Sequence, residues 1–241
     1  MNDEIIMSFI ELVDIDNIED TGYINMVDIQ VEDDESFILA SGIISHNSAI
    51  NGMTEERTPA IHGGLPLRGK VLNVNGESPK IVLDNQALTD IMNSIGLVIG
   101  QRANRHSLRY GKVYLAHDMD EDGKNIGALL VNFFYTYWPE LFDAHKEPYI
   151  SVFMTPFIIG EKGKERHYWY MDDHHTFKPE DWKGWKITRA KGLGTLKSAD
   201  WEHSLKHPKL MPLLDDGNLK ESLDLIFNST RADDRKAWIG L

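Results

Sequence analysis

Three aspartates alternate in the segment 117–123, which reads His-Asp-Met-Asp-Glu-Asp-Gly. Carboxylates this close repel one another unless a proton or a cation lies between them, and hard cations such as Mg²⁺ prefer oxygen ligands. Asp118, Asp120 and Asp122 are therefore candidate Mg²⁺ ligands. The alternative is an acidic turn at the start of a helix, where carboxylates interact favourably with the helix dipole. The spacing alone leaves both interpretations open.

A calcium-binding EF-hand also opens with Asp-x-Asp-x-Asp-Gly, but this segment does not continue as one. The twelfth position of such a loop would be Leu129, an apolar residue, where an EF-hand has a bidentate glutamate. The preceding residues, 113–116, read as a strand and not as a helix. We therefore exclude an EF-hand.

The aspartates lie between a predicted strand and a predicted helix. Val-Tyr-Leu-Ala at 113–116 predicts a short strand, and apolar residues at helical spacing predict a long helix over 126–142. This order is typical of an α/β fold, in which the site lies at the carboxyl end of the strand. Further strands are expected at 71–74, 149–159, 166–171 and 185–190, and further helices at 84–95, 198–206, 219–228 and 232–239.

Composition excludes several classes of protein. The chain has 241 residues, a formal net charge of −13 and no cysteine, so disulfides, zinc–thiolate sites and thiol nucleophiles are excluded. No apolar run approaches the roughly 18 residues that span a membrane, and the first residues do not resemble a signal peptide. We expect a cytoplasmic protein with no membrane partner.

The negative charge is concentrated at one end. Residues 1–47 hold twelve acidic side chains and no Lys or Arg, so residues 48–241 carry 26 acidic and 25 basic side chains and are nearly neutral. The overall acidity therefore does not exclude nucleic-acid binding. Residues 1–47 are also too rich in apolar side chains for a solvated tail, and we expect them to form a separate folded unit.

Four motifs follow one another along the remainder of the chain. They are 65–74 (Leu-Pro-Leu-Arg-Gly-Lys-Val-Leu-Asn-Val), 118–123, 191–195 (Lys-Gly-Leu-Gly-Thr) and 232–238 (Ala-Asp-Asp-Arg-Lys-Ala-Trp). This ordered set closely resembles the TOPRIM region of type IIA DNA topoisomerases, a family that includes gyrase B. The motif sequences are closer to those of the eukaryotic and T4-like phage enzymes. The resemblance implies a Rossmann-like, mostly parallel α/β sheet within 48–241 and a helical extension from about 198 to 241.

The same resemblance implies a function. Asp118 and Asp120 would bind Mg²⁺, with Asp122 nearby, and the metal would stabilise charge on the scissile phosphate of double-stranded DNA. The attacking tyrosine would lie on a separate DNA-cleavage subunit, and the ATPase domain on another polypeptide. The matching DNA-binding positions are Lys70, Asn73, Arg68 and Lys191. The enzyme would be an ATP-dependent topoisomerase that passes one duplex through another.

One family residue is absent. The TOPRIM region begins with Glu-Gly-Asp-Ser-Ala, whose glutamate ligates the metal, whereas here Ser48 follows His46 and Asn47. Residues 1–47 explain the departure, because 27–31 and 37–47 resemble the splice blocks of a C-terminal intein fragment, a small all-β (HINT) fold. Glu35 departs from that pattern, since a histidine is common there.

The residue types at 46–48 suit splicing chemistry. The Ser48 hydroxyl can accept an acyl group, the Asn47 amide can attack its own carbonyl and break the 47–48 bond, and His46 can protonate the leaving group. The resemblance implies a split intein whose N-terminal half lies on another polypeptide. Its extein would end in Glu-Gly-Asp, so that ligation restores the glutamate.

Two other functions stay open. One is a different TOPRIM enzyme, such as a primase or nuclease, against which the 65–70 and 191–194 motifs argue. The other is a non-catalytic DNA-binding remnant with an inactive intein. The T4-like motif sequences suggest a phage protein acting in the host cytoplasm. The pair His174-His175 is expected to form a surface turn and not a metal site.

Overall fold

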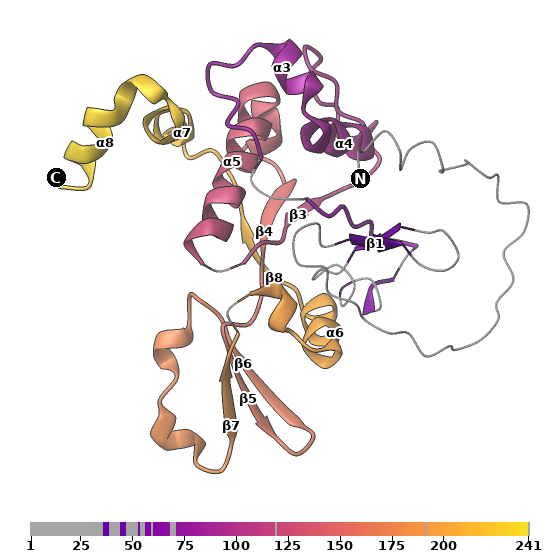
Figure 1. Cartoon of the computed structure of the whole chain (residues 1–241), viewed down its shortest axis with the longest axis vertical. Coiled ribbons are helices and arrows are strands. Elements are labelled where there is room, and N and C mark those ends of the chain that lie inside the picture. Colours follow the sequence, from indigo (N-terminus) through magenta and orange to yellow (C-terminus); the bar gives the residue numbers. More distant parts are fainter. Residues whose placement is uncertain are drawn as a thin grey trace, which may run out of the picture. The chain divides into compact units, whose positions relative to one another are not determined.

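The computed structural model describes residues 36–38, 44–46, 53, 56–58, 60–67, 71–118, 120–190 and 192–240. The chain divides into two units, Met1–Ser45 and His46–Leu241. Near their boundary, strands β1 (Ser36–Ile38) and β2 (Ile44–His46) form a two-stranded sheet, described by its backbone alone. All other described elements belong to the second unit (Figure 1).

The first sheet of the second unit, the inner sheet, has the order β3-β4-β8. Its strands are β3 (Val113–Leu115), β4 (Ile150–Met154) and β8 (Lys209–Pro212). β3 runs parallel to β4, but β4 runs antiparallel to β8. The prediction of a mostly parallel sheet is therefore wrong for the described strands. β8 was missed because Lys-Leu-Met-Pro is short and lacks alternation, and its proline is tolerated because β8 lies at the sheet edge.

Residues 71–74 form no strand, contrary to the prediction, although Val71 and Val74 are buried as the β-like pattern suggested. The side chain of Asn73 accounts for the extended course of this segment. Its amide group joins the segment to two helices through hydrogen bonds to Phe227 and Asn132, which replace the ladder bonds of a strand.

Helices α3 (Pro79–Asp84) and α4 (Gln86–Ile95) replace the single helix expected over 84–95. The break falls at Asn85, whose side chain accepts a hydrogen bond from the Leu88 N–H and caps α4. Gly96 ends α4 with φ of +89°, a left-handed conformation that glycine adopts without a steric cost.

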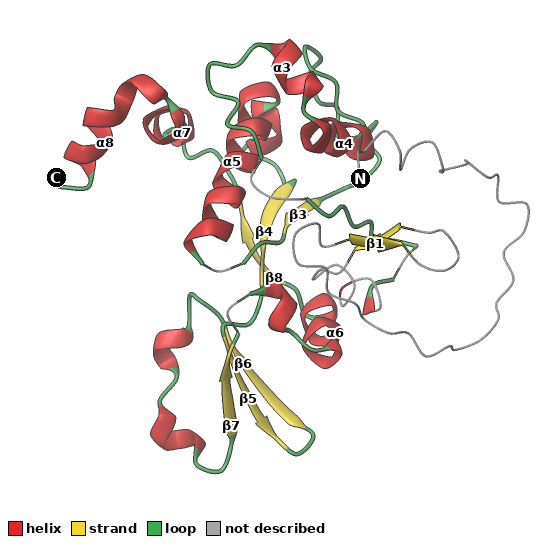
Figure 2. Ribbon diagram, in the orientation of Figure 1, coloured by secondary structure: helices red, strands yellow, loops and turns green. Residues whose placement is uncertain are grey.

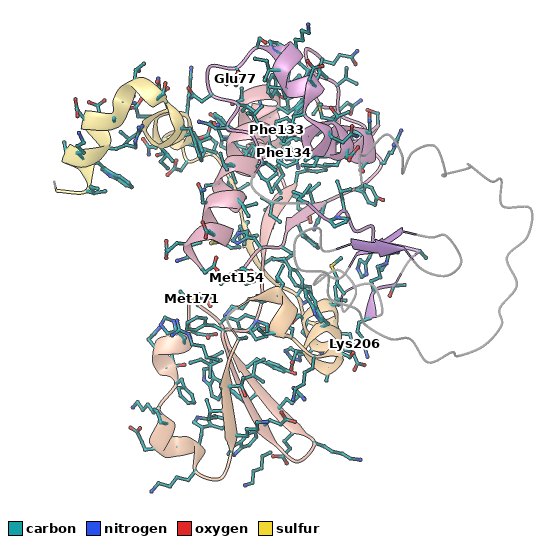
Figure 3. All side chains as sticks on the ribbon, viewed as in Figure 1. Glu77, Phe133, Phe134, Met154, Met171 and Lys206 are labelled. Atoms are coloured by element: carbon teal, nitrogen blue, oxygen red, sulfur yellow. The ribbon has the colours of Figure 1, made fainter. Side chains whose placement is uncertain are left out.

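Helix α5 (Glu121–Tyr137) begins five residues before the predicted start at 126. It ends earlier too, because Pro139 cannot continue an α-helix and a 3₁₀ turn, η1 (Pro139–Phe142), follows. Phe133 and Phe134 on α5 are almost completely buried and lie in a dense layer of side chains (Figure 3). They form the centre of the core with Leu88, Trp138, Leu141, Phe142 and Ile150.

The second sheet, the outer sheet, has the order β6-β5-β7 and is antiparallel throughout. Its strands are β5 (Ile158–Lys162), β6 (Glu165–Trp169) and β7 (Lys186–Arg189). The turns η2 (His174–Thr176) and η3 (Pro179–Trp182) lie beside one face, and α6 (Ser198–Lys206) lies by the other (Figure 2). The contacts agree, since Trp169 meets Trp182 at 4.6 Å between ring centroids, whereas Arg166 meets Asp200 of α6.

Helices close the chain where the sequence pattern expects them. After η4 (Leu193–Thr195) and α6 come α7 (Leu219–Phe227), η5 (Ser229–Arg231) and α8 (Ala232–Trp238). α7 packs against α5 through Leu223 and Phe227. No helix in the described part of the chain is long and apolar enough to cross a membrane.

Candidate metal and DNA-binding site

The predicted acidic turn lies between β3 and α5, at the carboxyl end of the strand. Asp120 is the N-cap of α5, and its Oδ1 accepts a hydrogen bond of 2.8 Å from the Gly123 N–H. Asp122 lies exposed in the first helical turn. The capping interpretation therefore holds for Asp120, and it leaves the second oxygen of that carboxylate for another contact.

Asp118 makes the long-range contact of the site. Its Oδ1 accepts a hydrogen bond of 2.7 Å from the backbone N–H of Leu193, which belongs to the Lys-Gly-Leu-Gly motif. Gly192 makes this approach possible: a Cβ there would lie 2.9 Å from both Cγ and Oδ1 of Asp118. Two of the motifs found in the sequence therefore meet at one carboxylate.

His117 is held beside this carboxylate by α5. Its Nδ1 lies 2.8 Å from the Asp118 backbone oxygen, and its Nε2 lies 2.6 Å from the position that a Cβ on Gly127 would occupy. Gly123 is equally crowded, since a Cβ there would lie 2.1 Å from the Asp118 backbone oxygen. The two helical glycines thus allow α5 to pack directly against the acidic turn.

The donor types at the turn fit Mg²⁺, because carboxylate oxygens are hard ligands. Asp118 and Asp120 each use Oδ1 for a backbone N–H, an arrangement that fixes the direction of the second oxygen. Among the described residues, no group of three or more His, Asp or Glu side chains lies close enough to hold a metal ion. A divalent cation bound at this turn would therefore need ligands beyond the described carboxylates.

The predicted DNA-binding residues differ in what the structure describes of them. Asn73 is described, and its side chain is engaged inside the protein: Nδ2 donates to the Phe227 carbonyl at 2.9 Å, and Oδ1 accepts from Asn132 Nδ2 at 3.2 Å and from the Asn75 N–H at 3.1 Å. Its proposed contact with DNA stays a prediction. Arg68, Lys70 and Lys191 lie outside the described residues, as do Asn47, Ser48 and the side chain of His46.

A second polar cluster joins the outer sheet to α6. The carboxylate of Asp200, which is 1% exposed, accepts hydrogen bonds from Arg166 at 2.6 Å, from Tyr168 at 3.2 Å and from the Lys197 N–H at 2.9 Å. Burial and the neighbouring Asp200 raise the pKa of Tyr168 to about 12. These groups are paired within the fold, so we interpret the cluster as structural.

Sequence reasoning overlooked one feature outside this site. Residues 91–117 contain no Asp or Glu, although the whole chain has 38 of them, and this segment includes Arg102, Arg105, Arg109 and Lys112. The absence of acids was the signal that could have revealed it. The structure places most of these residues in the ordered loop between α4 and β3.

Comparison with known proteins finds two adjoining domain families in this chain. Residues 45–154 match the Toprim domain family, and residues 153–241 match the C-terminal associated domain of TOPRIM. DNA topoisomerase 2 of Plasmodium falciparum (isolate K1 / Thailand) is 32% identical over 215 residues, which cover 85% of this chain and 15% of the relative. DNA topoisomerase 2-alpha of Gallus gallus is 30% identical over 239 residues, covering 93% of this chain and 14% of the relative.

A solved structure agrees as well. The crystal structure of the Plasmodium falciparum topoisomerase II DNA-binding, cleavage and re-ligation domain matches 79% of this chain with a TM-score of 0.67 and 29% identity, and the match covers 27% of that chain. The present chain spans less than a fifth of the length of the curated relatives above. Residues 45–241 are thus a Toprim domain followed by its C-terminal associated domain, and they correspond to the TOPRIM region of type II DNA topoisomerases.

Proposed function

We propose that this chain supplies the Mg²⁺-dependent part of the DNA cleavage and religation site of an ATP-hydrolysing type II topoisomerase. Such an enzyme changes DNA topology by passing one duplex through a transient break in another. The observation that carries the proposal is the hydrogen bond between the Leu193 N–H and Asp118, because it joins two motifs that lie 75 residues apart. A solvated acidic turn would need no such partner.

Each described residue has a distinct task in this proposal. Asp118 and Asp120 would hold Mg²⁺, with Asp122 nearby, and the bound metal would stabilise negative charge on the scissile phosphate. The Leu193 N–H orients the Asp118 carboxylate, and Gly192 leaves room for it. The implied DNA contacts are Arg68, Lys70, Asn73 and Lys191. The attacking tyrosine and the ATPase domain belong to partner polypeptides.

The proposal includes a maturation step in the first 47 residues. Residues 1–47 act as the C-terminal half of a split intein, and the pairing of β1 with β2 just before Asn47 supports a β-rich fragment. Ser48 Oγ accepts the upstream acyl group as an ester, Asn47 cyclises to a succinimide with cleavage of the 47–48 peptide bond, and His46 protonates the leaving amine of Ser48. That amine, once deprotonated, then attacks the ester carbonyl, so that the C–O bond to Oγ breaks, the peptide bond forms and the Ser48 hydroxyl is restored. Ligation places Glu-Gly-Asp before Ser48, so splicing completes the metal site.

Mass spectrometry of the peptide that ends at Arg57, taken from the native source, tests this step. A peptide with Glu-Gly-Asp before Ser48 supports splicing, and its upstream sequence identifies the partner. A peptide with Ile44-Ser45-His46-Asn47 before Ser48 shows that the intein is inactive there. The non-catalytic DNA-binding remnant would then become the leading interpretation. Asn47→Ala is the matched control, since it removes the cyclising amide and should leave the 47–48 bond intact.

Reconstitution tests the cleavage function separately. The spliced protein, combined with the ATPase polypeptide and the tyrosine subunit, is expected to cleave duplex DNA only with Mg²⁺, and Asp118→Asn should abolish cleavage. Wild-type protein that binds DNA but never cleaves it would favour the remnant.

Assembly of the intein halves should slow as salt rises, because residues 1–47 carry twelve acidic side chains and no Lys or Arg. We place all these steps in the cytoplasm of a phage-infected host.

A further inference from the structure

The loop between α4 and β3 exposes positive charge that the fold leaves uncompensated. The acid-free segment 91–117 contains this loop, which carries Arg102, Arg105, Arg109 and Lys112. Arg166 and Arg231 are neutralised by carboxylates: Arg166 pairs with Asp200, and Arg231 pairs with Glu221, Asp224 and Asp234. Arg235 instead donates to the backbone oxygens of Leu225 and Asn228, and Arg105 and Arg109 of the loop are bonded in that second way.

The guanidinium groups of this loop are held by neutral carbonyl oxygens. Arg105 donates to the backbone oxygens of Glu147 and Leu141, and Arg109 donates to that of Asn93. Arg102 is exposed, and no ion pair is found for it with any residue that the structure describes. A carbonyl fixes the position of a guanidinium but does not cancel its charge, so all three side chains keep a full positive charge, and those of Arg105 and Arg109 are held at defined positions.

The nearby acids are mostly occupied. Glu147 pairs with Lys112 at 2.5 Å, and Asp143 pairs with Lys146 at 3.1 Å. Glu140 accepts a hydrogen bond from the Ala103 N–H, so that its carboxylate binds loop backbone and no arginine. Glu140 keeps its own negative charge, so the surplus of positive charge on this surface is that of the three arginines less one charge.

The loop is also rigid enough to present these charges. Leu97 is buried, and Ile99, Ala103 and Leu108 pack against the core. Trp138 Nε1 donates to the backbone oxygens of Val98 at 3.3 Å and Gln101 at 3.1 Å. A small pocket of about 60 Å³ opens in the loop. Its lining includes Gln101, Arg102, Asn104, Ser107 and Trp138.

We propose that this loop, residues 96–112, binds the phosphate backbone of duplex DNA at a surface separate from the acidic turn. The loop precedes the amino end of β3, whereas Asp118 follows its carboxyl end. β3, with 3 residues that each rise roughly 3.3 Å, separates the end of the loop from the segment that carries Asp118, so the loop and the acidic turn lie at opposite ends of this strand. The inference rests on the proposed function only in taking DNA as the polyanion.

Arginine contacts to phosphate predict a specific dependence on salt, because each contact releases about one counterion. The test measures binding of the full chain to a fluorescent 30-base-pair duplex by anisotropy, in EDTA and from about 50 to 200 mM KCl. Arg102→Gln and Arg109→Gln should each weaken binding several-fold and lower the slope of log K against log salt by about 1. Arg102→Lys should keep the slope, since the charge remains.

Lys220→Gln is the matched control, because it removes one exposed positive charge from α7, away from the loop. The inference would be overturned if Arg102→Gln and Arg109→Gln had the same slope of log K against log salt as wild type. It would also be overturned if Lys220→Gln lost as much DNA affinity and slope as the two loop variants. Variants that bind DNA normally but lose a partner polypeptide would also overturn it, by assigning the loop to a protein interface. Circular dichroism checks that each variant is folded.

The outcome is distinguishable from failure of the proposed function. If the assembled enzyme cleaves DNA and Asp118→Asn abolishes cleavage, while the arginine variants keep the wild-type slope, the function stands and the loop inference fails. If the slopes fall as expected but the assembled enzyme never cleaves, the loop inference stands and the cleavage function fails.

Discussion

The backbone N–H of Leu193 donates a 2.7 Å hydrogen bond to Oδ1 of Asp118, and Gly192 lies close enough that any Cβ there would meet the same carboxylate. The Lys-Gly-Leu-Gly motif therefore acts on the acidic turn through its backbone and through the absence of a side chain. This explains why a glycine is needed there although its backbone, with φ of −163°, is one that any residue adopts.

Gly192→Ala is expected to disturb Asp118 without unfolding the protein. The new Cβ would lie 2.9 Å from Cγ of Asp118, so the carboxylate must shift and lose its bond to Leu193. A displacement of about 1 Å at a catalytic group costs roughly 100-fold in rate, and we expect a loss of that order in Mg²⁺-dependent cleavage. Calorimetric titration should show weaker Mg²⁺ binding. Gly194→Ala is the control, because a Cβ there has no atom within 4 Å; equal losses in both variants would contradict the explanation.

Gly127→Ala should lower the free energy of unfolding through contact with His117. The added methyl group would lie 2.6 Å from Nε2 of His117, and overpacking of this kind lowers the free energy of unfolding by about 1–3 kcal/mol. The better helix propensity of alanine offsets up to about 1 kcal/mol of that loss. Chemical denaturation measures the change. The double variant His117→Ala/Gly127→Ala should recover most of the loss, whereas Gly111→Ala, with open space around it, should change little. A Gly127→Ala protein as stable as wild type would disprove the contact.

Arg166→Met should destabilise the outer sheet. It leaves the carboxylate of Asp200, which is 1% exposed, without its cation, and breaking a buried pair costs about 3–5 kcal/mol. The Arg166 side chain is 19% exposed, so we expect a value near 3 kcal/mol, measured by thermal and chemical unfolding. Lys236→Met breaks the exposed pair with Asp233 and should have no measurable effect. If both variants lost a similar amount of unfolding free energy, burial of the ion pair would not determine how much stability its removal costs.

His203 should make stability depend on pH below the ordinary histidine pKa of 6.5. Burial, and then the neighbouring His207, lower the pKa of His203 below its ordinary value of 6.5, although Asp200 opposes the shift. The unfolded chain therefore binds more protons in this window, and stability is lost as the pH falls through 6.5 towards the folded-state pKa.

The measurement compares melting temperatures at pH 7.5 and 5.5. Wild type should lose more stability than His203→Phe, which cannot titrate but keeps a ring to stack on Tyr168, 4.1 Å away between ring centroids. Carboxylates with lowered pKa values, such as Glu161 beside Lys197, titrate below about pH 4.5 and do not contribute in this window. Identical pH profiles for the two proteins would rule out His203 as the cause.

Elements with a strong local pattern were predictable. The helix expected over 198–206 is α6 with the same bounds, and the strand, acidic turn and helix around Asp118 occur in the predicted order. The break between α3 and α4 was missed because the capping role of Asn85 was not recognised. β8 was missed because strand pairing with β4 depends on residues about 55 positions away, which no local pattern reports.

The site was predictable in its residue types but not in its contacts. Asp118 and Asp120 stand out by spacing, whereas the bond from Leu193 uses a backbone N–H, a group that every non-proline residue has. The inward-facing amide of Asn73 was likewise hidden, because asparagine suits both a DNA contact and an internal bond. The splice residues at 46–48 stay predictions.

The antiparallel pairing of β4 with β8 has a consequence for how the domain folds. Met154 pairs with Lys209, so residues 155–208 leave the inner sheet and return to the same place. Closing a disordered loop of that length costs roughly 3–4 kcal/mol in chain entropy. The outer sheet, whose hairpin β5–β6 is local, can form first and shorten the path that remains to be closed. The formation of the sheet next to the acidic turn is then expected to depend on the β5–β6 hairpin, which lies outside that sheet.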